Sequence, residues 1–287
     1  MNVSIKPHIY IPLLSLRSTK RTLLFGLLFL ISQSLPGQDT LKENYIKNTI
    51  YDHGELWKKT VSPKEYNYRV LLPLAVATGT SIYFDETISR EVISFRQRHE
   101  LNKISNTITH FGDPYLLGSA TLLAYGSGWI FRDSKLQQTS LMAAQAYIHN
   151  GIFTYLGKLA FARQRPFVNS KDNWHFFPYS LQDHETSATA YQSFPSGHTS
   201  GIFAIATVVA KQYNENFWIP TIAYSMATLT GVSRISESKH WLSDVIVGAA
   251  LGYGIGHFVV ESNKNTQFTL FPTYWENSVS LTLQLEI

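Results

Sequence analysis

Six long apolar segments, separated by short polar breaks, constrain the fold of this chain most. Each segment is 14 to 23 residues long, which exceeds the length of most β-strands, so the segments predict helices. The chain is therefore expected to be an all-α protein built as a helical bundle. The segments cover residues 70–84, 114–131, 140–162, 200–213, 217–232 and 241–260.

The composition of these segments leaves the surroundings of the bundle open. Several segments approach the length of a membrane span, but Ser, Thr, Gly, Gln and His dilute them. The mean hydropathy is near zero, which is low for a bundle fully immersed in lipid. A bundle packed in water and a bundle partly seated in a bilayer both explain the pattern.

The N-terminal 37 residues have the pattern of an export signal. Two basic residues, Lys20 and Arg21, precede the apolar run at 22–32, and small or turn-forming residues follow up to Gly37. Four of the 24 basic residues and none of the 20 acidic ones lie in this segment, so the rest of the chain has no formal net charge. We therefore expect an exported protein, periplasmic or associated with an envelope membrane. We expect no nucleic-acid partner.

The C-terminal residues change from helical to strand periodicity. Apolar and polar residues alternate from 279 to 287, and the segment 267–271 is a candidate partner strand, with a turn near 272–277. The sequence thus predicts a short C-terminal β-hairpin. The expected organisation is a signal (1–37), a lead-in with the first helices (38–104), a core (105–262) and a hairpin tail (263–287).

Three polar stretches carry residues suited to chemistry on an anion. Lys158 and Arg165 are seven residues apart, so a continuous helix places both cations on one face. Arg234 adds a planar guanidinium suited to phosphate oxygens. A basic helix end in solvent would also explain the first pair.

Proline, serine and glycine at 195–197 predict a turn into a helix that begins near His198. A helix N-terminus presents unpaired N–H groups to an anion, Gly197 allows close approach, and Ser196 can cap the helix or donate its hydroxyl. His198 is placed to give a proton to a leaving group. A simple serine cap beside an incidental histidine remains the alternative.

His240 and Asp244 are at i and i+4, so on a helix the carboxylate can hold one ring nitrogen and leave the other free as a base or nucleophile. An ordinary surface pair of these residues is the alternative. Taken together, the three stretches suit phosphoryl transfer, in which positioning and charge neutralisation supply most of the catalysis.

The combination resembles the type 2 phosphatidic acid phosphatase (PAP2) superfamily, which includes lipid phosphatases, bacterial acid phosphatases and vanadium haloperoxidases. The resemblance spans roughly residues 105–260, and "THFGDP" at 109–114 is a weaker upstream match. It is carried by K-x6-R-P (Lys158–Pro166), P-S-G-H (Pro195–His198) and S-R-x5-H-x3-D (Ser233–Asp244).

The resemblance implies a role for each matching residue. His240 would form a phosphohistidine, Asp244 would orient and stabilise it, and His198 would protonate the leaving oxygen. The phosphate-binding set would be Lys158, Arg165, Arg234, the Ser196 hydroxyl and the Gly197 N–H, with Ser233 supporting Arg234. No metal or cofactor is expected.

The expected activity is hydrolysis of lipid phosphomonoesters or pyrophosphates at a membrane. The alternatives are a soluble periplasmic acid phosphatase, a vanadate-dependent haloperoxidase and a non-enzymatic membrane protein. One further pattern, "GYGIG" at 252–256, superficially resembles a nucleotide-binding loop but lies within an apolar helix. Glycines at 248, 252 and 256 instead predict a smooth helix face for close packing.

Overall fold

The computed structural model of the chain describes residues 9–12, 45–61, 68–168, 174–177, 188–264, 267–275 and 278–286. The chain divides into two compact units. One unit spans Tyr51–Ser262, and the other combines Met1–Ile50 with Asn263–Ile287. The predicted export signal, residues 1–37, lies outside the described residues except for the short strand β1 (Ile9–Pro12).

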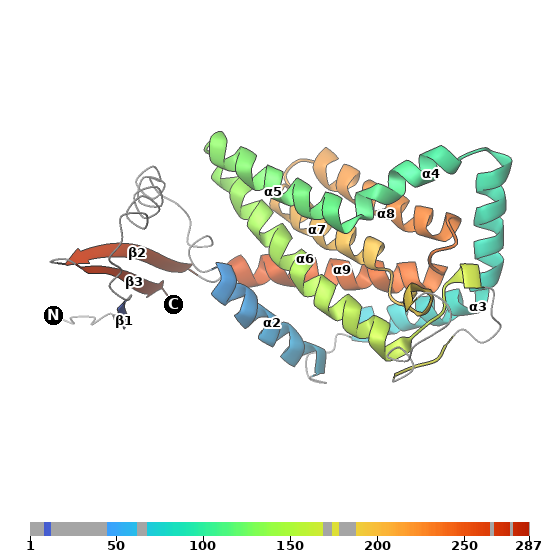
Figure 1. Cartoon of the computed structure of the whole chain (residues 1–287), viewed down its shortest axis with the longest axis horizontal. Helices are drawn as coiled ribbons and strands as arrows, with labels where there is room; N and C mark the ends of the chain where they lie inside the picture. Colours follow the sequence, from blue (N-terminus) through green and yellow to red (C-terminus); the bar gives the residue numbers. More distant parts are fainter. Residues whose placement is uncertain are drawn as a thin grey trace. The chain divides into compact units, whose positions relative to one another are not determined.

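Tyr51–Ser262 form a helical unit, and the predicted all-α class is confirmed (Figure 1). Each of the six apolar segments lies in a helix of its own, apart from one or two end residues. Short 3-10 turns occur at η2 (His110–Gly112), η3 (Pro166–Val168) and η5 (Ala188–Tyr191). The helices are α2 (Tyr45–Val61), α3 (Tyr68–Arg98), α4 (Asn102–Thr109), α5 (Pro114–Ile130), α6 (Ser134–Phe161), α7 (Gly197–Gln212), α8 (Trp218–Ser236) and α9 (Leu242–Lys264).

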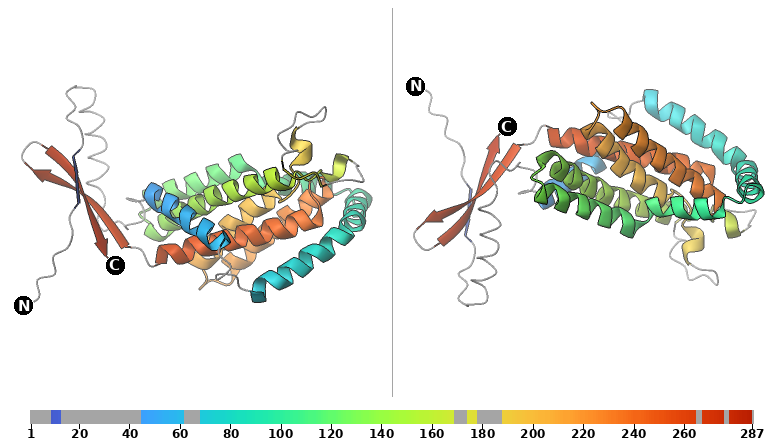
Figure 2. Two further views of the ribbon diagram at one scale, coloured as in Figure 1. Left: turned by 90° about the horizontal axis from the view of Figure 1, so that it is seen from below. Right: turned by 90° about the horizontal axis from the view of Figure 1, so that it is seen from above.

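Helix α7 is central in this unit. It packs against α6 and α8, and α5 packs on α6. A core cluster joins Leu117 of α5, Ile202 and Ala206 of α7, and Ala227 of α8. Helix α3 lies beyond α9, on the side that faces away from α5 and α6 (Figure 2). This arrangement brings the starts of α7 and α9 and the end of α6 to one region.

Glycines on one face of α9 allow that helix to approach α7 closely. A Cβ atom at Gly252 would lie 2.2 Å from the backbone oxygen of Ser200, and one at Gly248 would lie 2.7 Å from that of Ser196. A Cβ atom at Gly256 would lie 2.6 Å from the backbone oxygen of Ala204. The predicted close-packing face is therefore confirmed, and no nucleotide loop is formed by these residues.

The end of α6 differs from the sequence prediction. The helix ends at Phe161, because Ala162 adopts the left-handed conformation (φ 40°) and its N–H bonds to the backbone oxygen of Lys158. Arg165 therefore lies beyond the helix, and the prediction that Lys158 and Arg165 share a helix face is wrong. The physical reason is the reversal at Ala162, which turns the following residues toward α9 and α3.

The smaller unit contains a three-stranded sheet of order β1-β3-β2. Strands β2 (Gln267–Trp275) and β3 (Ser278–Glu286) pair antiparallel, from Gln267 opposite Glu286 to Trp275 opposite Ser278. Strand β1 pairs antiparallel with β3. The predicted turn at 272–277 starts too early, because β2 continues through Pro272 to Trp275, but its predicted end agrees with the start of β3 at Ser278.

Candidate active site

The residues of the three motifs come from four helix ends. Lys158 lies in the last turn of α6, and Arg165 lies after that helix. Ser196 precedes α7, whose first residue is Gly197, and His198 follows in its first turn. Arg234 lies in the last turn of α8, and Asp244 lies in the first turn of α9.

His240 precedes α9 by two residues, so the prediction that it shares a helix with Asp244 is wrong. The segment between α8 and α9 is turned instead by hydrogen bonds from the N–H groups of Lys239 and His240 to the backbone oxygen of Arg234. The His240 ring nevertheless approaches Asp244, with 3.6 Å between Nδ1 and Oδ2.

The hydrogen bonding of the buried His240 ring fixes its tautomer. Nδ1 lies 2.7 Å from the backbone oxygen of Ser193, which only accepts hydrogen bonds. Nδ1 therefore carries the hydrogen, and in the neutral ring Nε2 keeps its lone pair. Burial, together with the charges of Lys158 and Arg165 and against the opposing effect of Asp244, lowers the pKa of His240 to about 3. The ring is thus neutral at physiological pH.

Asp244 is fully buried and accepts hydrogen bonds on both carboxylate oxygens. Oδ2 accepts from the Ser193 hydroxyl at 2.5 Å and from the Trp241 N–H at 2.8 Å, and Oδ1 accepts from Arg163 at 2.6 Å. Burial alone would raise the pKa of Asp244. The contact with His240, the charge of Arg163 and the Ser193 hydroxyl outweigh burial, so this pKa lies below its ordinary value.

The start of α7 is joined directly to the start of α9. The Ser196 N–H donates to the backbone oxygen of Asp244 at 3.1 Å. The Ser196 hydroxyl pairs with Thr199 Oγ1 at 2.9 Å and makes no hydrogen bond to the helix N-terminus. A Cβ at Gly197 would meet Thr154 and Lys158 at 3.6 and 3.8 Å, which are ordinary contacts. Packing within the protein therefore does not require glycine at this position.

The charges of neighbouring cations lower the pKa of Lys158 and of Arg165. Burial and the charges of Arg165 and Arg234 lower the pKa of Lys158 to about 7, against an opposing effect of Asp244. Burial and Arg234 likewise lower the pKa of Arg165 to about 10. Among the described residues, Lys158 donates to the Gln192 backbone oxygen at 2.5 Å, and Nε of Arg165 and of Arg234 are buried without a hydrogen-bond partner. The cluster thus has positive charge and free donors to offer an anion.

His198 lies beside this cluster as a neutral imidazole. Burial lowers its pKa to about 4, and Arg234, Arg165 and Lys158 add to the effect, while Asp113 opposes it. A Cβ at Gly112 would lie 2.7 Å from the His198 Cβ, so the chain before α5 packs directly on this histidine.

The upstream stretch "THFGDP" supports the site from residues 109–114. Thr109 Oγ1 accepts from Arg234 Nη1 at 2.5 Å, and Asp113 caps α5 by accepting from the N–H groups of Tyr115 and Leu116. Glu237 forms an ion pair with Arg234 at 3.2 Å. This weaker sequence match therefore has a structural basis, because it holds one cation of the site and packs on one histidine.

The residues with polar contacts at the site that were missed from the sequence include Asp85, Arg163, Ser193 and Glu237. Arg163 and Glu237 lie within the motifs, and Ser193 lies two residues before Pro195. Their closeness to the motifs in the sequence could have identified these three residues. Asp85 follows the first apolar segment and carried no such signal. Within the described part of the chain, no three His, Asp or Glu side chains gather as ligands for a metal ion.

The fold and the site together define a helical protein in which two neutral histidines lie beside a cluster of cations suited to binding an anion. The PAP2 superfamily model matches residues 138–267, a range that contains every motif residue named above. Lipid A 1-phosphatase of Porphyromonas gingivalis is 29% identical over 197 residues, which are 68% of this chain and 38% of that protein. The comparisons support assignment of the region 138–267 to the PAP2 superfamily.

Two further relatives have lower identity. Lipid A 1-phosphatase of Rhizobium etli is 25% identical over 193 residues, which are 61% of this chain and 78% of that protein. The crystal structure of Aquifex aeolicus LpxE aligns with a TM-score of 0.48 and 24% identity, over 62% of this chain and 95% of that one. The matched part of this chain covers well under half of the Porphyromonas gingivalis protein.

Proposed function

We propose that the chain is a phosphatase that hydrolyses phosphomonoesters or pyrophosphates of lipids through a phosphohistidine intermediate. The observation that carries the proposal is the His240 ring, whose Nδ1–H is held by the Ser193 backbone oxygen at 2.7 Å, so that Nε2 keeps its lone pair. Lys158 and Arg165 are near enough to lower the pKa of this ring. A neutral imidazole beside an anion site is suited to attack on phosphorus.

The reaction proceeds in two balanced steps. A bound phosphate dianion raises the pKa of His198, so this ring carries a proton when the substrate is present. Nε2 of His240 attacks phosphorus, a P–N bond forms as the P–O bond breaks, and the leaving oxygen takes a proton from the His198 imidazolium, which becomes neutral. Water then attacks the phosphohistidine, His198 takes a proton from the water, the P–N bond breaks and inorganic phosphate leaves. The Asp244 carboxylate, 3.6 Å from Nδ1, stabilises the positive charge of the intermediate.

The cations hold the phosphoryl oxygens during both steps. Arg165 and Arg234 lower the pKa of Lys158, and Arg234 lowers that of Arg165, so a bound dianion offsets the repulsion between these cations. The Ser196 hydroxyl and the Gly197 N–H complete the set. Such donors are most effective when they are aimed at the charge that develops in the transition state.

Three observations support a lipid substrate and association with a membrane. Large apolar side chains are exposed on α3, α5 and α8, and extensive apolar surface is typical of protein that contacts lipid or a partner. Among the described helices, Leu242–Asn263 has the length and apolar composition of a membrane span, a property that core helices of soluble proteins share. The two curated relatives are named lipid A 1-phosphatases. We also propose that residues 1–37 direct export to the envelope.

The His240→Ala variant tests the proposal. Release of phosphate from lipid A phosphate or phosphatidylglycerol phosphate should fall by about 1,000-fold or more, as expected for loss of a nucleophile. The phosphoenzyme, trapped by rapid denaturation at alkaline pH and recognised by loss of its label in acid, should disappear. His99→Ala is the matched control, because His99 is an exposed histidine that follows α3. Wild-type turnover by His240→Ala would refute the phosphohistidine.

A second comparison tests the substrate class. Lipid phosphates and p-nitrophenyl phosphate are assayed side by side, with and without detergent, and the lipid is expected to be preferred. Vanadate, which can adopt the geometry of the transition state, should inhibit both reactions. Equal or better turnover of the soluble ester without detergent would favour a soluble acid phosphatase instead.

A further inference from the structure

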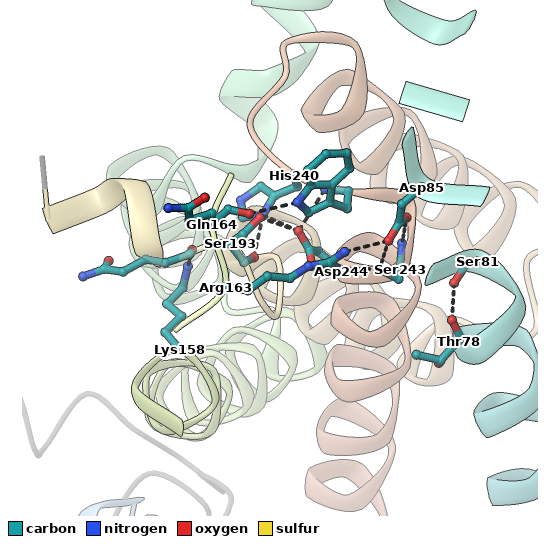
Figure 3. A network of polar contacts seen from close by, with 12 residues as sticks. Thr78, Ser81, Asp85, Lys158, Arg163, Gln164, Ser193, His240, Ser243 and Asp244 are labelled. Carbon is teal, nitrogen blue, oxygen red and sulfur yellow. Dashed lines mark hydrogen bonds and ion pairs between the residues drawn. The ribbon is translucent and has the colours of Figure 1, made fainter. Parts of the chain in front are cut away.

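A chain of buried charges lies behind His240 and reaches α3. The Arg163 guanidinium lies between two carboxylates (Figure 3). Nη2 is 2.8 Å from Oδ2 of Asp85, and Nη1 is 2.6 Å from Oδ1 of Asp244. The three side chains are at most 3% exposed. Asp85 thereby connects α3 to the acid group that contacts His240.

Ser243 closes this chain into a network. Its hydroxyl accepts from Arg163 Nη1 at 2.6 Å and donates to Asp85 Oδ2 at 2.5 Å, while its N–H donates to Asp85 Oδ1 at 2.9 Å. Burial holds the pKa of Asp85 above its ordinary value, although Ser243 and Arg163 oppose this effect by donating to the carboxylate. Since each of these partners donates a hydrogen bond, the ionised form of the Asp85 carboxylate can accept all of them.

Two indole rings enclose the guanidinium. Its Cζ lies 4.3 Å from the Trp174 ring centroid and 5.4 Å from that of Trp241, which are distances for cation–π contact. Arg163 is therefore held by two carboxylates and by contacts with two aromatic rings. Because its fork occupies Oδ1 of Asp244, Oδ2 remains for Ser193, the Trp241 N–H and the approach of His240.

The order of charges in this network, with Arg163 between Asp85 and Asp244, affects how strongly Asp244 can stabilise a cationic His240 ring. Arg163 alone would neutralise Asp244 and weaken its stabilisation of a cationic ring at His240. Asp85 supplies a second negative charge on the far side of Arg163, so the three groups retain a net charge of minus one. A buried ion network is not required for stability, because apolar side chains of similar volume often stabilise as well.

We propose that Asp85 and Arg163 are positioning residues that fix the Asp244 carboxylate and maintain its negative charge toward His240. They lie outside the eight residues that carry the chemistry, and the inference rests on the proposed function. Asp85 also lies well before the region matched by the superfamily model, which begins at residue 138. The site therefore depends on α3.

The Asp85→Asn variant tests this inference in the purified full chain. It removes one charge with little change of shape, so kcat and the rate of phosphoenzyme formation should fall about 10- to 100-fold, a loss expected for a misplaced group. KM and inhibition by vanadate should remain within about 2-fold of wild type, because the phosphate-binding cations are untouched. Asp85→Glu should restore part of kcat.

The matched control is Asp52→Asn. Asp52 is another buried carboxylate, 6% exposed, and it accepts from Gln145, which belongs neither to the motifs nor to the network of Asp85 and Arg163. This variant should lose stability without loss of kcat. Where Asp85→Asn does not accumulate, Arg163→Lys replaces it, since a lysine keeps the charge but cannot bridge two carboxylates.

A folded Asp85→Asn or Arg163→Lys protein with wild-type kcat would overturn the positioning role. A loss of stability in either variant without a loss of kcat, as expected for Asp52→Asn, would also overturn the positioning role. Failure of the proposed function is recognised separately, because it requires that His240→Ala remain active. An inactive His240→Ala together with a fully active Asp85→Asn would refute the positioning role alone.

Discussion

The close contact between α9 and α7 predicts opposite effects for two substitutions in one helix. A Cβ added at Gly252 would lie 2.2 Å from the Ser200 backbone oxygen, whereas nothing lies within 4 Å of one added at Gly254. Ordinary contact begins at 3.4 Å, so Gly252→Ala requires a displacement of about 1 Å. The neighbouring atom belongs to the backbone of α7 and cannot rotate away.

The magnitudes follow from these contacts. Alanine gains about 1 kcal/mol over glycine within a helix, and Gly254→Ala should show this gain. At Gly252 the same gain is opposed by an overpacking cost of about 3 kcal/mol, the upper part of the usual range. Gly252→Ala should therefore lose about 2 kcal/mol, and the two variants should differ by about 3 kcal/mol.

Thermal unfolding followed by circular dichroism measures this difference. For a helical unit of this size, about 3 kcal/mol corresponds to roughly 6–12 °C in Tm. Because α9 also carries Asp244, Gly252→Ala should lower kcat at temperatures at which it remains folded, and Gly254→Ala should not. Equal Tm values for the two variants would refute the close-packing argument.

Two further predictions concern pH. Since the pKa of Lys158 is lowered to about 7, kcat/KM should fall as the pH rises from about 6 to about 9. Lys158→Arg should flatten this profile, and an unchanged profile in that variant would contradict the role of Lys158 in phosphate binding. Burial and, secondarily, the neighbouring His53 lower the pKa of His149 to about 4, so the unfolded chain binds its proton first as the pH falls below about 6.5. The free energy of unfolding should then decrease by up to about 3 kcal/mol between about pH 6.5 and about pH 4. Urea titrations should show a smaller decrease for His149→Gln. An identical decrease in the variant would be inconsistent with a buried neutral ring at His149.

The sequence predicted those parts of the protein that depend on local periodicity and motif spacing. Helix length followed from the apolar segments, and the glycine face of α9 followed from a four-residue spacing. The end of α6 could not be read in this way, because its left-handed residue is Ala162, where glycine is the usual signal. The placement of His240 before α9 likewise depends on a turn bonded to Arg234.

Long-range ion pairs were beyond the reach of the sequence for a different reason. Arg163 and Asp85 are 78 residues apart, and no local pattern distinguishes a buried charge from a solvated one. Within "KLAFARQRP", the motif singles out Arg165, but Arg163 is the residue that forms the buried ion pairs with Asp85 and Asp244. Ser193 contacts His240 through its backbone oxygen, and any residue type supplies that group.

The contact of Asp85 with Arg163 has a practical consequence for the choice of expression boundaries. A fragment trimmed to residues 138–267 would retain all eight motif residues. It would nevertheless leave the Arg163 guanidinium with one carboxylate in place of two, and it would deprive Arg234 of the Thr109 hydroxyl. Truncated versions intended for crystallography or inhibitor screening should therefore start before α3, at the cost of including its exposed apolar side chains.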